Sequence, residues 1–81
     1  MRLPRDLSGD DLAAALKLFG YRVTRQTGSH LRLTTATNGE HHVTIQRHAL
    51  PVGTLAGILG AVAEHFGMTR DEVAERLFGT R

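Results

Sequence analysis

The sequence predicts an α+β domain in which a three-stranded antiparallel sheet carries helices on one face. Two observations predict this class. Apolar residues recur at helical spacing at both ends of the chain, and they alternate with polar residues in three short runs between. Turn-forming glycines separate these runs, as is typical of hairpins. The predicted order is α-β-β-β-α-α in two layers.

Composition narrows the class of protein further. The chain has 81 residues, enough for one domain over residues 1–81, and 41% of them are hydrophobic, so a small core can form. It contains no cysteine, which excludes disulfides and thiolate chemistry. No apolar run approaches the ~20 residues of a membrane span, and the amino terminus does not resemble a signal peptide. We therefore expect a cytoplasmic protein that does not associate with membranes.

The first helix is predicted over residues 9–19. Ser8 and Asp11 have the spacing of a capping box at its start. Apolar residues follow at helical spacing, and Gly20 suits the left-handed residue that ends a helix.

The three alternating runs are predicted strands near residues 21–26, 30–34 and 42–46. Directly opposed residues of an antiparallel pair share a face, so Val23 and Leu33 should be opposed on the core side. A three-residue loop at 27–29 meets this condition and pairs Gln26 with His30 and Thr24 with Arg32. A two-residue Gly-Ser turn would instead set Val23 against Thr34.

The same reasoning places an odd-length loop around residues 37–39, because it pairs Leu33 with Val43 and Leu31 with Ile45. One face of the sheet is then apolar and needs a cover of helices. The other face is polar, and its predicted members are Arg22, Thr24, Gln26, His30, Arg32, Thr34, His42, Thr44 and Gln46.

Two helices are predicted after the strands. Pro51 suits a first helical turn, an apolar stripe continues to Phe66, and Gly67 ends this helix. Thr69 and Glu72 form a second capping box before a short third helix.

Positive charge and histidine concentrate in the middle of the chain. Residues 20–50 contain four arginines against Glu40 alone, together with four of the five histidines. This pattern favours an anionic partner for the sheet, although a chance grouping of surface arginines would look the same.

The run Gly28-Ser29-His30 carries the clearest candidate chemistry. Gly28 permits close approach of a ligand to the backbone, Ser29 adds a hydroxyl, and a histidine can exchange protons during phosphodiester transfer. The alternative, which the residues alone favour, is a solvent-facing histidine beside a turn. His48 follows the third strand and could help Arg47 to bind a phosphate, or it could be a loop histidine without a role.

Other polar residues have structural explanations. His41 and His42 are adjacent and so point to opposite faces of a strand, and no spacing of histidines and carboxylates predicts a metal site. His65 stands in the last turn of its helix, where a cation suits the helix dipole, so we interpret it as structural.

Taken together, these stretches resemble the HicA (YcfA-like) toxin family, small mRNA interferases of bacterial toxin–antitoxin pairs. The resemblance rests on residues 18–33, which include Arg25-Gln26-Thr27-Gly28-Ser29-His30, on residues 43–48, which end in His48, and on residues 51–59, which include Gly53-Thr54-Leu55. It covers about residues 3–78. The chain departs from the family pattern at Ala49, Val52 and Ala56, which dilutes the usual positive charge.

The resemblance implies a double-stranded-RNA-binding-like fold, cleavage of mRNA without metal or cofactor, and inhibition by a cognate HicB-type antitoxin. Carried over by position, His30 matches the catalytic histidine, Gly28 and Ser29 match the turn that presents it, and His48 matches a second histidine.

The leading hypothesis is therefore a ribonuclease toxin in which Arg22, Arg32 and Arg47 bind RNA and His30 acts as acid or base. The alternatives are an RNA-binding module without catalysis and a domain that only docks an antitoxin.

Overall fold

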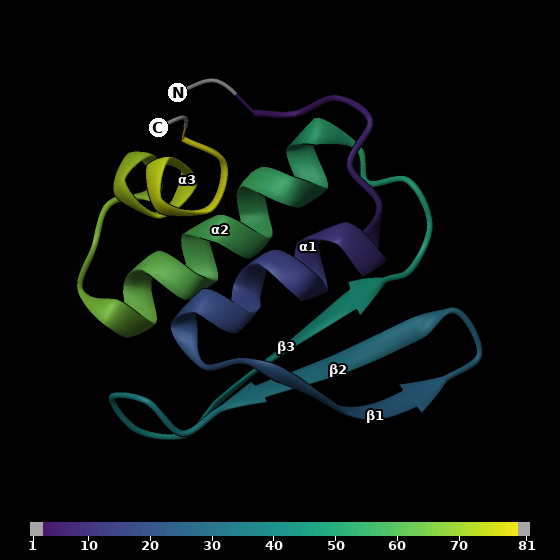
Figure 1. Ribbon diagram of the computed structural model, residues 1–81, viewed down its shortest axis with the longest axis horizontal. Helices are drawn as coiled ribbons and strands as arrows, with labels where there is room; N and C mark the ends of the chain where they lie inside the picture. Colours follow the sequence, from purple (N-terminus) through teal and green to yellow (C-terminus); the bar gives the residue numbers. More distant parts are fainter. Residues whose placement is uncertain (1–2, 80–81) are drawn as a thin grey trace.

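The helices lie on one side of a three-stranded sheet and leave its other side open (Figure 1). The computed structural model describes residues 3–79. In chain order the elements are α1 (Gly9–Ala15), the 3₁₀ turn η1 (Leu16–Phe19), β1 (Arg22–Thr27), β2 (His30–Thr35), β3 (His41–Gln46), α2 (Val52–Phe66) and α3 (Arg70–Phe78). The predicted α+β class and the predicted order of elements are confirmed.

The first helix spans residues 9–19 as predicted, with its last turn tightened into η1. The capping box is present: the Asp11 amide donates to Ser8 Oγ at 3.1 Å, and the Ser8 amide donates to Asp11 Oδ2 at 3.3 Å. Gly9 lies against the end of β3, where its amide donates to the carbonyls of Arg47 and His48. A Cβ atom at this position would overlap the Gln46 carbonyl, so only glycine lets α1 begin so close to β3.

The sheet has the order β1-β2-β3, with β2 in the centre. The β2–β3 register is the predicted one, since Leu31 is opposite Ile45 and Leu33 is opposite Val43. The odd-length loop between them is also confirmed, because Thr35 pairs with His41 across it.

The β1–β2 hairpin differs from the prediction. Its turn consists of the two residues Gly28 and Ser29, because Thr27 pairs with His30. Val23 is still opposite Leu33, and a β-bulge at Thr24 absorbs the extra residue. The predicted three-residue loop at 27–29 is therefore wrong, and the two-residue Gly-Ser turn is the one that forms.

The bulge changes the partners of two residues. The predicted pairs of Gln26 with His30 and of Thr24 with Arg32 are wrong, since Gln26 is opposite Leu31 and Arg25 is opposite Arg32.

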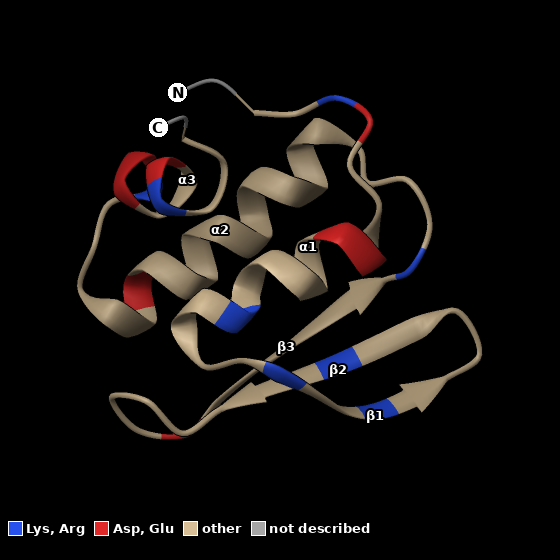
Figure 2. Ribbon diagram, viewed as in Figure 1, with Lys and Arg blue, Asp and Glu red and all other residues tan. Residues whose placement is uncertain are grey.

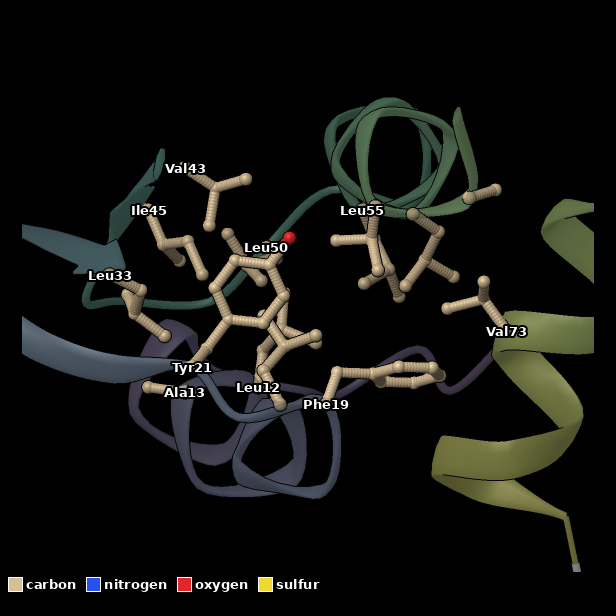
Figure 3. Close-up of a cluster of buried hydrophobic side chains, with 14 of the residues drawn as sticks. Leu12, Ala13, Phe19, Tyr21, Leu33, Val43, Ile45, Leu50, Leu55 and Val73 are labelled. Carbon is tan, nitrogen blue, oxygen red and sulfur yellow. The ribbon is translucent and has the colours of Figure 1, made fainter. Parts of the chain in front are cut away.

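The core lies between the sheet and the helices (Figure 3). Val23, which was predicted for the inner face, is 48% exposed. β1 is an edge strand, and its residues are all exposed, so the helical layer covers β2 and β3 but not β1. The buried members of the inner face are Tyr21, Leu31, Leu33, Val43 and Ile45.

The last two helices pack on each other, and α2 also packs against β3 (Figure 1). Pro51 is the N-cap of α2, one position before the first turn where we expected it, and Gly67 ends the helix with φ 65°. Thr69 and Glu72 form the predicted capping box of α3. No helix among residues 3–79 is long and apolar enough to span a membrane.

Two histidines join the β2–β3 loop to the end of α2. The ring of His65 is stacked on that of His41, with centroids 4.5 Å apart. His65 Nε2 lies 2.9 Å from the Thr37 carbonyl and 3.0 Å from the Gly39 carbonyl, and because carbonyls only accept, Nε2 must carry a hydrogen. On the other side, His41 Nδ1 is 2.7 Å from the Tyr21 hydroxyl. His65 therefore has the structural role that we predicted.

Candidate functional site

The open side of the sheet, which we call the outer face, is polar and positively charged. Arginines lie on β1 and β2, whereas most acidic residues lie on the helices (Figure 2). The strand pairing places the following residues on this face: Arg22, Arg25, Thr27, His30, Arg32, Thr34, His42, Thr44 and Gln46, joined by Thr24 of the bulge.

His30 lies at one end of the outer face, in a pocket that sequence reasoning did not foresee. The pocket, which we call the His30 pocket, is lined by Arg25, Thr27, His30, Arg32 and Thr44, and so by all three strands. His30 is the first residue of β2 and lies opposite both Thr27 and Gln46. Its ring is exposed, so an incoming substrate can reach it.

The turn that presents His30 is open on its solvent side. Gly28 has φ 56°, in the region that favours glycine, and no neighbouring atom lies within 4 Å of the space where a Cβ would stand. The Ser29 carbonyl accepts a hydrogen bond of 2.8 Å from the Arg47 amide, which continues the β2–β3 ladder past Gln46. The base of the turn is therefore held while its tip remains accessible.

Two arginines flank the His30 pocket without any acidic partner. Arg25 and Arg32 are directly opposed on neighbouring strands, an arrangement that is destabilising for like charges. Among residues 3–79, neither side chain forms an ion pair. A cationic pair of this kind is a binding site for an anion.

The far end of the outer face is a separate polar network. Thr24 Oγ1 and Thr34 Oγ1 are 2.8 Å apart, and Thr34 Oγ1 is 2.8 Å from His42 Nδ1. His42 Nε2 is 3.8 Å from a Glu40 carboxylate oxygen. Arg22 is opposite Thr34 and Thr34 is opposite His42, so three predicted members of the polar face lie side by side at this end.

Arg47 does not share the surface of the other predicted arginines. Its Nε is 3.3 Å from Asp10 Oδ1, which ties it to α1. It lines a groove between α1 and the helix-facing side of the sheet, together with Lys17 and Val23. The structure therefore brings together His30 and Arg32 but leaves Arg47 on the opposite side.

His48 is exposed and lies two residues beyond Gln46, the residue opposite His30. Both histidines are therefore at the same end of the sheet. By contrast, burial, helped by the nearby His65 and His42, lowers the pKa of His41, while Glu64 opposes this effect. No group of three metal-ligating side chains lies together in the part of the chain that the structure describes.

Arg25 is the charged residue of the His30 pocket for which the sequence pattern predicted no role. Its position follows from the two-residue turn, because β1 ends at Thr27 on the outer face and every second residue counted back from there lies on the same face. A Gly-Ser pair flanked by strands is a recognised two-residue turn signal, and it was the available clue.

Comparison with known proteins agrees with the earlier resemblance. A profile of the family described as HicA toxin of bacterial toxin-antitoxin matches residues 9–67, well over half of the chain. The matched stretch runs from the first residue of α1 to the residue that ends α2, and it includes the whole His30 pocket. No individual curated protein and no solved structure gave a significant match.

Proposed function

This chain belongs to the HicA toxin family of toxin–antitoxin systems, and from that premise we propose that it cleaves mRNA on the outer face of its sheet. The observation that supports the proposal is the His30 pocket, where an accessible histidine stands beside two arginines without acidic partners. A histidine supplies proton transfer, and arginines supply charge stabilisation, which are the two requirements of RNA cleavage by transesterification.

In the proposed reaction, His30 accepts the proton of a ribose 2′-hydroxyl while the 2′-oxygen attacks the adjacent phosphorus. The new P–O2′ bond forms as the P–O5′ bond breaks. The leaving 5′-oxygen takes a proton from His48, the other histidine at this end of the sheet. The products are a 2′,3′-cyclic phosphate and a 5′-hydroxyl. His30, His48 and the arginines account for each proton and charge, so the reaction requires no metal ion.

The other residues have supporting roles in this proposal. Gly28 and Ser29 form the open turn that leaves space for the RNA backbone beside His30. Arg22, at the far end of the outer face, binds a second phosphate of the same strand. Arg47 is engaged with Asp10, so we assign it to the packing of α1 on β3 rather than to RNA contact.

The proposal is tested by inducing variants in growing bacteria. We expect the wild-type chain to arrest growth and His30→Ala to relieve the arrest, because loss of an acid–base group lowers a rate by ~10²–10⁴-fold. His42→Ala is the matched control, since it removes a histidine from the same face but outside the His30 pocket. Undiminished arrest by a well-expressed His30→Ala would contradict the proposal.

The alternative is a domain that binds RNA or antitoxin without catalysis. It is favoured by one observation: among the described residues, no side chain holds the His30 ring by a hydrogen bond. Binding of RNA by the purified chain with no cleavage under any condition would support this alternative.

A further inference from the structure

We propose that Arg25 and Arg32 form a clamp for the phosphate that is cleaved, and that Arg25 is therefore a catalytic residue. This inference rests on the proposed ribonuclease function and adds the group that stabilises its transition state. It is carried by the strand pairing, which sets the two arginines directly opposite each other in the His30 pocket.

The bulge fixes the position of this pair. Two conditions must be met together in β1: the two-residue turn places Arg25 on the outer face, and Val23 is opposite Leu33 on the inner face, where it lines the groove beside α1. Only one residue separates them, so regular alternation cannot meet both conditions, and Thr24 is displaced into a bulge. Thr24 Oγ1 donates to the Arg32 carbonyl at 3.3 Å, which ties the bulge to the strand that carries the second arginine.

The charge of the pair matches the transition state better than the substrate. A phosphodiester carries one negative charge, whereas the pentacoordinate species formed by attack of the 2′-oxygen carries two. Two guanidinium groups with no acidic partner supply two positive charges, each with a planar fork of donors. The attraction between such a pair and the phosphate grows as the second negative charge develops. The pair therefore lowers the activation barrier of cleavage rather than only strengthening the binding of RNA.

A carboxylate of a protein partner is the competing ligand for two arginines. Thr27 and Thr44, each of which carries a hydroxyl group, line the same pocket, and His30 supplies a proton-transfer group there. A phosphodiester with its neighbouring 2′-hydroxyl can interact with all of these groups. A carboxylate has no proton that His30 could accept, so it would leave the histidine without a function. The surroundings therefore favour the phosphate.

The test compares Arg25→Gln with Arg76→Gln, which removes the same charge from α3 and lies outside the His30 pocket. Cleavage rates are measured at saturating RNA. Affinities are measured separately for an RNA whose 2′-hydroxyls are replaced by 2′-methoxy groups, which cannot react. We expect Arg25→Gln to lower kcat by roughly 10²–10³-fold, the range for loss of one donor to a developing charge. Its affinity for the unreactive RNA should fall by less than about tenfold.

Folding is checked by thermal denaturation, in which Arg25→Gln should melt no lower than wild type because a like-charge contact has been removed. Arg25→Lys is a second variant that keeps the charge but loses the fork, and it should also lower kcat. A kcat for Arg25→Gln and Arg25→Lys equal to that of Arg76→Gln would overturn the clamp while cleavage by His30 stands. Absence of any cleavage by the wild-type chain would instead overturn the proposed function.

Discussion

The histidines of the outer face are not equivalent, because only some of them can act on the phosphate bound beside His30. His42 is opposite Thr34, four residues along β2 from His30, which is ~13 Å at the rise of a strand. It is also engaged with Thr34 and near Glu40. His48 follows β3 at the end where His30 lies and has an exposed side chain. His48 is therefore the histidine that we assign to the leaving group.

This assignment predicts that His48→Ala and His30→Ala will differ in how their cleavage rates depend on the leaving group of the substrate. His48→Ala should cleave RNA ~10²–10⁴-fold more slowly than wild type but should cleave a nucleoside 3′-(4-nitrophenyl) phosphate at the wild-type rate, because nitrophenolate leaves without a proton. His30→Ala should be slow on both substrates, since each needs the 2′-hydroxyl deprotonated. Initial rates on the two substrates give the comparison. Equal losses on both substrates for His48→Ala would show that it does not act as the acid.

At the scale of elements, the β2–β3 loop is attached to α2 by the stacked rings of His41 and His65. His65 Nε2 donates to loop carbonyls, and the Asn38 side-chain amide donates to the His65 carbonyl at 2.9 Å. The Tyr21 hydroxyl, whose pKa burial raises to about 12, remains neutral and can donate to His41 Nδ1. Because His41 Nδ1 accepts this hydrogen bond, the contacts among Tyr21, His41 and His65 favour the neutral form of His41.

Acidification should weaken this attachment. The pKa of His41 is lowered from the ordinary value of 6.5 by burial and by His65 and His42, and Glu64 only partly offsets this. Because the folded state disfavours the proton, the contribution of His41 to stability is complete above pH 6.5 and is lost as the pH falls through the lower pKa of the folded protein.

We therefore expect wild type to have a lower urea midpoint at pH 5.5 than at pH 7.5, with a smaller difference in His41→Gln. His48→Gln is the control and should keep the wild-type difference, because His48 is exposed and is not among the groups that shift the pKa of His41. An identical pH dependence in His41→Gln and wild type would show that another group is responsible.

The hairpins also show what the sequence could predict. Leu31, Leu33, Val43 and Ile45 alternate without interruption, so their register was readable from the pattern. The register of the β1–β2 hairpin could not be predicted in this way. A three-residue loop and a two-residue turn with a bulge both oppose Val23 to Leu33, so hydrophobic alternation cannot distinguish them.

The same limits apply to the grouping of the candidate site residues, whose functional roles stay predictions. His30 and Arg32 belong to β2, whose register was correct, and the structure places them in one pocket. Arg25 depended on the turn and was missed. The ion pair of Arg47 with Asp10 joins distant parts of the chain, and the sequence alone does not show it.

At the scale of the whole molecule, the helices cover one side of the sheet and leave the cationic side free (Figure 2). Membership of the HicA toxin family implies an antitoxin partner. We propose that the antitoxin covers the outer face around Arg22, His30 and Arg32, because an inhibitor must keep RNA from the His30 pocket. An acidic surface on the antitoxin would suit these charges.

Arg32→Glu should then weaken antitoxin binding by about tenfold or more, because like charges would meet across the interface. Arg76→Glu makes the same charge reversal on α3, away from the outer face, and should bind as wild type does. Calorimetric titration with the protein encoded beside this gene measures both affinities. Equal binding by wild type and Arg32→Glu would place the antitoxin elsewhere.

The most direct measurement is the rate at which the purified wild-type chain and His30→Ala cleave RNA in excess EDTA, with the product ends identified. We expect wild type to cleave at its full rate and to leave 2′,3′-cyclic phosphate ends, because His30 and the arginines supply the chemistry. His30→Ala should be slower by ~10²–10⁴-fold while remaining folded. Wild-type activity that disappears in EDTA and returns with a divalent ion, or a His30→Ala variant as fast as wild type, would contradict cleavage by His30.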